Sequence, residues 1–197
     1  HLQVGDVLSC QSPDGVFHGE DHHNRSTLLL SAGSGVTPMI SMLRFMADQQ
    51  TLDDVVFYHQ CSTEEDIPYR EELEHLSQQH AGLTILISLS QAPLNWFGLK
   101  GRLSAMHLKQ VKDVPQREVF VCGPEGFMQQ AKSLLIQAGL SPNQYHQEAF
   151  TAERVEHHGE KSIKVTINGY TFIGDNQGSV LEQAENAEIH IPNSCRA

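Results

Sequence analysis

The stretch STLLLSAGSGVTPMISMLRFM, residues 26 to 46, decides the fold of this chain. Its first six residues form a short apolar run, which is typical of a strand buried on both faces of a parallel sheet. A glycine turn follows, and from residue 36 to residue 48 the apolar side chains recur at helical spacing. The sequence therefore predicts a strand, a tight turn and a helix in direct succession.

The same rhythm continues through the middle of the chain. Further apolar runs at 54–61, 83–90, 118–123 and 145–150 predict four more strands, and helical patterns lie at 69–80, near 103–110 and at 124–139. Strands that alternate with helices in this way are typical of a doubly wound α/β fold with right-handed crossovers. We expect a parallel sheet of five strands.

The two ends follow other patterns, and the predicted boundaries are 1–25, 26–152, 153–161 and 162–197. Residues 1–25 hold two short apolar runs broken by turns, which predict two strands, and the charged stretch before residue 162 is a linker. Alternating residues around Asn168 and Gly169 predict a β-hairpin at 163–174. A short helix near 179–187 and an extended run at 188–192 complete the prediction.

Composition limits the classes of function. The chain of 197 residues has 24 acidic and 13 basic residues, for a net charge of −11, which disfavours nucleic acid and anionic membranes as partners. No apolar run reaches the roughly 20 residues of a membrane span, and no signal peptide is visible, although the chain starts at His1 without methionine. The four cysteines are widely spread, which favours reduced thiols and a cytoplasmic location.

The first motif is GSGVTP, residues 33 to 38, between the first strand and the first helix. Glycines let the backbone approach a bulky anion, and the N-terminus of the next helix favours negative charge. Together they suit a pyrophosphate. Pro38 replaces the third glycine of the usual dinucleotide fingerprint, so a turn that serves only helix packing is the alternative.

The second motif is CGPEGFM, residues 122 to 128, directly after the fourth predicted strand. Its place at the carboxyl edge of the sheet puts Cys122 where α/β sheets bind ligands. The alternative is that Cys122 is a buried packing residue.

The two motifs, with KGRLS at 100–104 between them, resemble the ferredoxin-NADP reductase-like superfamily over residues 26–150. The resemblance implies that the glycine turn holds the pyrophosphate of a nicotinamide dinucleotide, and that the Cys-Gly-Pro segment guides the nicotinamide toward a flavin. It implies that Phe150 covers the flavin ring with Glu148 near N5; for Phe150, a plain core role is the alternative. The implied catalytic residues are Cys122, Glu148 and Phe150. The implied nucleotide and flavin contacts are Gly33, Ser34, Gly35, Val36, Thr37, Pro38, Cys122, Gly123, Pro124, Phe127 and Phe150.

The resemblance also suggests an origin for both ends. Residues 1–25 look like the last strands of a flavin-binding barrel, and residues 162–197 look like the start of a β-grasp, plant-type ferredoxin domain, so that the chain would be truncated at both ends. Cys195 would then be the first ligand of a [2Fe–2S] cluster whose loop has the spacing C-x4-C-x2-C. A stray terminal cysteine, or an interaction domain without a cluster, is the alternative.

This domain order is similar to phthalate dioxygenase reductase and to hybrid-cluster protein reductase. It implies an enzyme that passes electrons from NADH through FAD and [2Fe–2S] to an acceptor, either an oxygenase component or a hybrid-cluster protein. Glu64, Glu65 and Asp66 follow the second strand without a nearby cation, which favours NADH over NADPH; the alternative is that these acids only begin a helix. A non-catalytic nucleotide-binding module is the rival function.

Overall fold

The computed structural model describes residues 3–9, 15–19, 25–150, 161–167, 169–176 and 179–189. The chain divides into two compact units, His1–Glu148 and Ala149–Ala197, and each is described by itself.

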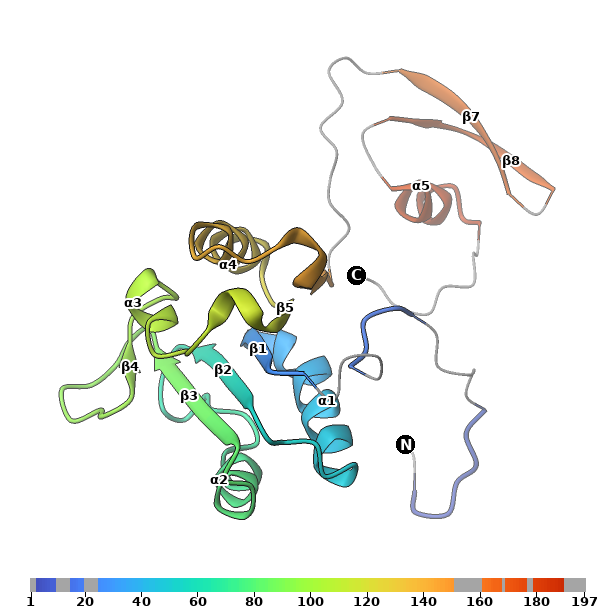
Figure 1. Cartoon of the computed structure of the whole chain (residues 1–197). Helices are drawn as coiled ribbons and strands as arrows, with labels where there is room; N and C mark the ends of the chain where they lie inside the picture. Colours follow the sequence, from blue (N-terminus) through green and yellow to red (C-terminus); the bar gives the residue numbers. More distant parts are fainter. Residues whose placement is uncertain are drawn as a thin grey trace. The chain divides into compact units, whose positions relative to one another are not determined.

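A six-stranded parallel sheet forms the centre of the first unit, with the order β4-β3-β2-β1-β5-β6 (Figure 1). The strands are β1 (Thr27–Ala32), β2 (Val55–Cys61), β3 (Leu83–Leu89), β4 (Leu99–Lys100), β5 (Glu118–Cys122) and β6 (Tyr145–Glu148). Every residue of β1 and β5 is buried, as continuous apolar runs in a parallel sheet require.

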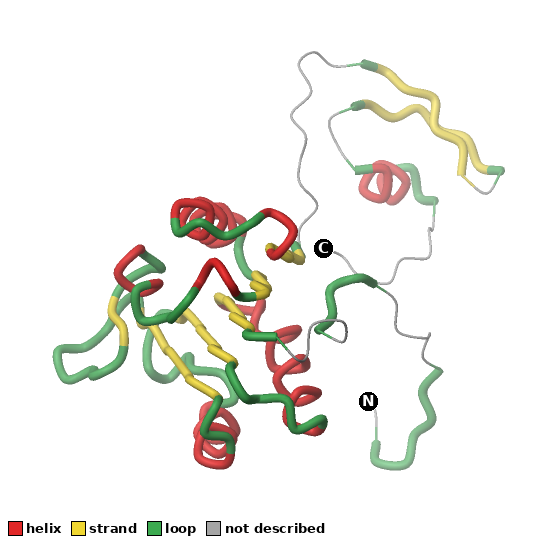
Figure 2. Tube along the Cα trace, viewed as in Figure 1, coloured by secondary structure: helices red, strands yellow, loops and turns green. Residues whose placement is uncertain are grey.

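Helices cover both faces of this sheet (Figure 2). They are α1 (Val36–Asp48), α2 (Arg70–Gln79), α3 (Ala105–Leu108) and α4 (Glu125–Gln137), with 3-10 turns at Gly33–Gly35, Val114–Gln116 and Pro142–Gln144. Leu28 and Leu30 of β1 pack in one cluster with Ala131 and Leu135 of α4. Fully burying one such leucine contributes about 1.5–3 kcal/mol. The doubly wound α/β prediction is confirmed.

The sheet has one strand more than predicted. β4 is only two residues long, and it pairs with β3 through Ser88 opposite Leu99 and Leu89 opposite Lys100. Two residues carry no period that a sequence pattern can detect, and the surrounding stretch is rich in turn residues. All five predicted strands are present.

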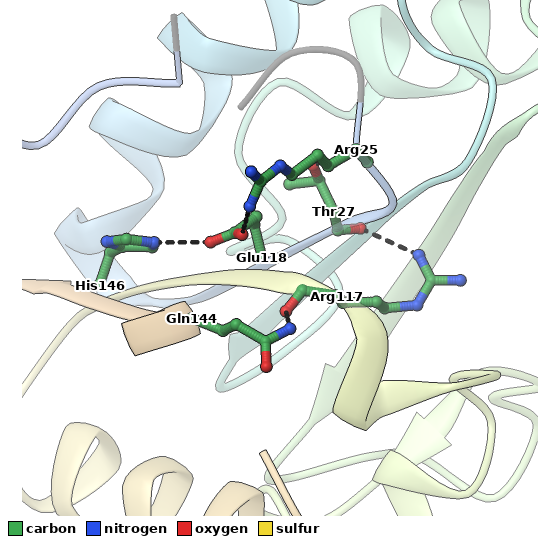
Figure 3. A network of polar contacts seen from close by, with 6 residues as sticks. All are labelled: Arg25, Thr27, Arg117, Glu118, Gln144 and His146. Carbon is green, nitrogen blue, oxygen red and sulfur yellow. Dashed lines mark hydrogen bonds and ion pairs between the residues drawn. The ribbon is translucent and has the colours of Figure 1, made fainter. Parts of the chain in front are cut away.

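A polar network fixes the amino ends of β1, β5 and β6 (Figure 3). The buried Glu118 carboxylate binds Arg25 and accepts a hydrogen bond from His146 Nε2 at 2.9 Å. The neighbouring Arg117 is also buried; its guanidinium donates to the Thr27 carbonyl at 3.3 Å and to Asp54 Oδ1 at 2.7 Å. This edge lies opposite the carboxyl edge on which both sequence motifs were found.

The described residues before β1 form no strand. Residues 3–9 and 15–19 are turns and irregular chain, so the two strands predicted for 1–25 are not found in these segments. A strand forms only where a partner strand satisfies its backbone groups. Phe17 nevertheless packs edge-on against Phe120 of β5, with ring centroids 5.6 Å apart.

The second unit contains the predicted hairpin and helix. β7 (Ser162–Ile167) and β8 (Tyr170–Asp175) pair antiparallel, with Ile167 opposite Tyr170, and α5 (Val180–Asn186) follows. The amide of Gln183 holds α5 against β8: Oε1 accepts from the Asp175 N–H at 2.7 Å, and Nε2 donates to the Asp175 carbonyl at 3.0 Å. Of the extended run at 188–192, only Glu188 and Ile189 lie inside the described residues, and they form no strand.

No helix within the described ranges is long and apolar enough to cross a lipid bilayer.

Candidate functional site

A cleft of about 870 Å³ opens at the carboxyl edge of the first unit's sheet. Its lining includes Ala32 of β1 and Gly33 after it, Gln60 and Cys61 of β2, and Pro124 after β5. The volume falls within the range of small-molecule and cofactor sites, about 300–1,000 Å³. Ligands of parallel α/β sheets bind in this position, outside the carboxyl ends of the strands.

The glycine turn and the Cys-Gly-Pro segment meet at this edge, backbone against backbone. A Cβ atom on Gly35 would lie 2.2 Å from the carbonyl oxygen of Cys122 and 2.6 Å from the nitrogen of Gly123. No real side chain tolerates such distances, so only glycine fits at position 35. The two motifs, about 90 residues apart in the sequence, therefore lie together at the floor of the cleft.

The turn leads directly into α1, and no side chain caps the N-terminus of that helix. The Val36 N–H donates to the Gly33 and Ser34 carbonyls, and the positive end of the helix dipole at this N-terminus favours an anion. The backbone of Gly33 adopts a left-handed conformation, with φ of 54°, and Thr37 Oγ1 donates to the Ser34 carbonyl at 3.0 Å, which closes the turn. Of the six predicted residues in the turn, Gly33 lines the cleft.

Cys122 ends β5, directly beside Ser31 of β1 and Glu148 of β6 in the sheet register. Burial, and after it the charge of Glu148, raises the pKa of Cys122 to about 11. The thiol is therefore neutral at physiological pH and is a poor nucleophile. Cys122 is fully buried and does not line the cleft, whereas Pro124 and Phe127 of the same motif do.

The structure places Glu148 beside Cys122 in the sheet register. Phe150 belongs to the second unit, and Cys195 lies outside the described residues. Their roles stay predictions. Within the described residues, no group of three or more His, Cys, Asp or Glu side chains is placed to hold a metal ion.

Sequence reasoning missed His59, which lines the cleft from β2. It is buried, its Nδ1 lies 2.9 Å from Ser31 Oγ, and burial lowers its pKa to about 4. It is therefore a neutral hydrogen-bonding group below the cleft at physiological pH. A histidine inside the otherwise apolar run DVVFYHQC was the available signal.

Sequence reasoning also missed the role of Arg102, although it quoted the KGRLS segment that contains this residue. Arg102 lines the cleft beyond β4, and Asp66 lines it after β2. The Asp66 carboxylate accepts hydrogen bonds from the backbone N–H and the hydroxyl of Thr63, each at 3.0 Å. Among the described residues, Asp66 and Arg102 are the charged groups that line the cleft, and their charges are opposite.

The residues present fit an adenine dinucleotide. The cleft is long enough to pass from β4 to β5, its floor includes a glycine turn at a helix N-terminus, and it has one cationic side chain. A glycine turn at a helix N-terminus suits a pyrophosphate, and clefts of this volume hold cofactors.

Comparison with known proteins gives a family and several relatives. The family described as "Oxidoreductase NAD-binding domain" matches residues 29–133. The glycine betaine monooxygenase reductase subunit of Chromohalobacter salexigens is 35% identical over 198 residues, covering 98% of this chain and 52% of the relative. The NADPH oxidoreductase of Mycobacterium tuberculosis is 30% identical, covering 99% of this chain and 50% of the relative.

A solved structure of the CS-b5R domains of human Ncb5or in its NAD+ form is 32% identical, with a TM-score of 0.63. The match covers 74% of this chain and 43% of that chain. The chain spans about half the length of the curated relatives it matches. The family match covers more than half of the chain and contains both motifs of the cleft floor. The chain therefore belongs to the family of oxidoreductase NAD-binding domains.

Proposed function

We propose that this chain is the nucleotide-binding part of an NADH-dependent flavin and iron–sulfur reductase that supplies electrons to an acceptor protein. The observation that carries the proposal is the contact between Gly35 and Cys122, which joins a phosphate-binding turn to the segment beside the expected nicotinamide. The cofactors supply the redox chemistry, because a nicotinamide gives a hydride to a flavin, which passes single electrons to a cluster.

The chain's own residues bind and orient the nucleotide. The turn at 33–38 and the N-terminus of α1 hold the pyrophosphate, while Pro124 and Phe127 border the nicotinamide half. Cys122 is a neutral steric guide beneath the ring, in keeping with its raised pKa of about 11. Hydride transfer needs no general base, so no catalytic role is assigned to the buried, neutral His59.

The wall after β2 favours NADH over NADPH. Asp66 faces the cleft there, and a carboxylate repels the 2′-phosphate of NADPH. Arg70, the nearest cation along the chain, is bound to Glu64 at 2.8 Å and to Glu74 at 3.1 Å, so its charge is already balanced.

The flavin and cluster assignments rest on fewer observations. Glu148 ends β6 beside Cys122, which supports its place near a flavin, and Phe150 follows two residues later. The hairpin and helix of 162–186 support a β-grasp domain with Cys195 as a cluster ligand.

We expect residues 1–197 alone to give no NADH-driven dye reduction; measurable turnover would contradict this.

The acceptor is proposed from chemistry and from a relative. A monooxygenase reductase subunit is among the proteins similar to this chain, which favours an oxygenase component over a hybrid-cluster protein as the acceptor. Both are redox proteins that take single electrons.

The first test is a titration of the chain with NADH and with NADPH, in which nucleotide fluorescence and calorimetry measure the binding. We expect one binding site, with NADH bound more tightly. A folded protein that binds neither nucleotide would overturn the proposal. Binding without NADH-driven reduction of a one-electron dye by the full-length gene product would instead favour the non-catalytic module.

A further inference from the structure

The loop at 91–98, here called the apolar loop, precedes the edge strand β4 and displays two large apolar side chains. Leu94 and Phe97 are each 100% exposed to solvent, and neither lines the nucleotide cleft. Figure 1 shows the loop projecting from the edge of the sheet beside β4, with α3 on one side and α2 on the other. A single exposed leucine is ordinary, but two large apolar side chains exposed together on a projecting loop are typical of an interaction surface.

Contacts within the apolar loop hold these two side chains in place. Trp96 Nε1 donates a hydrogen bond to the Leu99 carbonyl at 2.9 Å, and Lys100 Nζ donates to the Leu94 carbonyl at 3.3 Å. The ring of Trp96 covers Gly98, where an added Cβ would lie 2.6 Å from a ring atom. The loop is therefore braced before it meets a partner, and a preorganised loop loses little conformational entropy on binding.

The edge of the sheet beside the apolar loop is open. β4 pairs with only the last two residues of β3, and none of the described strands covers the rest of that edge. Ile85, Leu86 and Ile87 in this stretch are half-buried. With Trp96 of the loop, Ile85 and Ile87 also border a small cavity of about 120 Å³ between β3 and α2. Open strand edges and exposed apolar surface favour contact with another chain.

The charges on the two sides of the apolar loop are opposite in sign. The segment at 64–74, which leads into and includes the first part of α2, has six acidic residues and one arginine, and is here called the acidic half. The segment at 99–112, which includes β4 and α3, has three lysines, one arginine and no acidic residue, and is here called the basic half. The apolar loop therefore lies between an acidic and a basic surface.

An apolar centre with opposite charges on its two sides is complementary to a copy of itself. In a two-fold dimer the same patch of both chains meets across the axis. When this axis lies in the contact plane, perpendicular to the line from α2 to α3, the acidic half of each copy faces the basic half of the other. The apolar loops then meet at the centre, where buried aromatic and aliphatic side chains dominate binding. A uniformly acidic partner would instead meet like charge at the acidic half.

We propose that the apolar loop is the centre of an interface between two copies of this chain, with Leu94 and Phe97 as its anchors. The proposal goes beyond the nucleotide site and does not depend on it, because the anchors lie outside the cleft. Interfaces with few apolar anchors are weak and transient, so we expect a reversible dimer with a dissociation constant in the micromolar range.

Sedimentation velocity of the chain from about 1 μM to about 500 μM measures this dissociation constant. L94Q and F97Q each remove one anchor, and because both side chains are fully exposed, neither change disturbs the fold. I136Q is the matched control, since Ile136 is 58% exposed but lies on α4. We expect L94Q and F97Q each to raise the dissociation constant about tenfold or more, and I136Q to change it less than twofold.

Two charge reversals test the two-fold arrangement. E74K places a cation in the acidic half, and K109E places an acid in the basic half; both positions are exposed. Each variant alone then sets like charges against each other, and we expect its dissociation constant to rise about three- to tenfold. In an equimolar mixture of the two variants, opposite charges face each other again on both sides of the axis, so we expect mixed dimers as tight as those of the wild type.

The same measurements contain the results that contradict the proposal. A chain that stays monomeric over the whole concentration range would overturn it and leave the apolar loop to a different partner. A dimer that I136Q weakens as much as F97Q has its interface elsewhere. A mixture of E74K and K109E that associates no better than either variant alone would exclude the two-fold arrangement, and growth beyond the dimer would show a head-to-tail contact in its place.

Discussion

At the scale of single residues, Gly35 is the residue on which the site geometry depends most. It permits a backbone contact that no side chain could occupy, since any Cβ would overlap the Cys122 carbonyl at 2.2 Å. The clashing atoms are backbone atoms of Cys122 and Gly123, so no flexible side chain can move to relieve the clash.

We therefore expect G35A to lower the free energy of unfolding by about 2–4 kcal/mol, as strained insertions into packed sites do. Chemical denaturation measures the effect. G126A is the matched control for stability, because a Cβ there meets nothing within 4 Å and alanine favours the first turn of α4. If G35A proves as stable as G126A, the close contact does not exist in solution.

His59 gives a second prediction at this scale, for the dependence of stability on pH. Burial lowers its pKa to about 4 in the folded chain, below its ordinary value of about 6.5. The unfolded chain therefore binds more protons between these values, and stability is lost as the pH falls from about 6.5 to 4. We expect H59Q to flatten this loss by up to about 3 kcal/mol.

The check is denaturant unfolding at several pH values. H75Q is the control, because it makes the same His-to-Gln change at an exposed position on α2. Parallel pH profiles for wild type and H59Q would show that His59 does not carry the effect.

At the scale of elements, Arg117 joins β1 to the segments that precede β2 and β5 at the amino edge of the sheet. Its guanidinium donates to the carbonyl of Thr27 on β1 and to the carboxylate of Asp54 before β2. It also donates to the Lys112 carbonyl at 2.7 Å. Removing it would take a donor from the Thr27 and Lys112 carbonyls and from the Asp54 carboxylate, and would leave a void where a buried side chain had packed. We expect R117A to lower the free energy of unfolding by about 2–4 kcal/mol.

The matched control is R44A, which breaks an exposed ion pair between α1 and α2. Arg44 binds Glu72 at 2.6 Å, but about half of its side chain is exposed to solvent. Such surface pairs contribute at most about 1 kcal/mol. Equal effects of R117A and R44A in urea denaturation would contradict the structural role of the buried arginine.

The elements also show what sequence patterns can and cannot predict. β1 and β5 were found because a strand buried on both faces must be a continuous apolar run. β4 was missed because two residues carry no period. The contact at Gly35 depends on backbone segments far apart in sequence, which no local pattern contains. The motifs did identify the edge of the sheet where the cleft lies.

At the scale of the whole molecule, the chain joins two units with different kinds of core. The first unit buries its apolar side chains between helices and a parallel sheet. The described part of the second unit contains a hairpin and a helix, and it leaves Ile173 and Tyr170 largely exposed. The proposed nucleotide site lies wholly in the first unit, since every residue that lines the cleft comes from it.

This separation gives a prediction for the whole chain. A ligand that binds only the folded first unit at about 100 times its dissociation constant stabilises that unit by about 2.7 kcal/mol. We expect saturating NADH to slow amide hydrogen exchange about a hundredfold for the most protected amides of β1 and β5, those that exchange through unfolding of the unit. Exchange in β7, β8 and α5 should stay unchanged. Equal protection of the hairpin would mean that nucleotide binding and the second unit are coupled, and that the two units act as one.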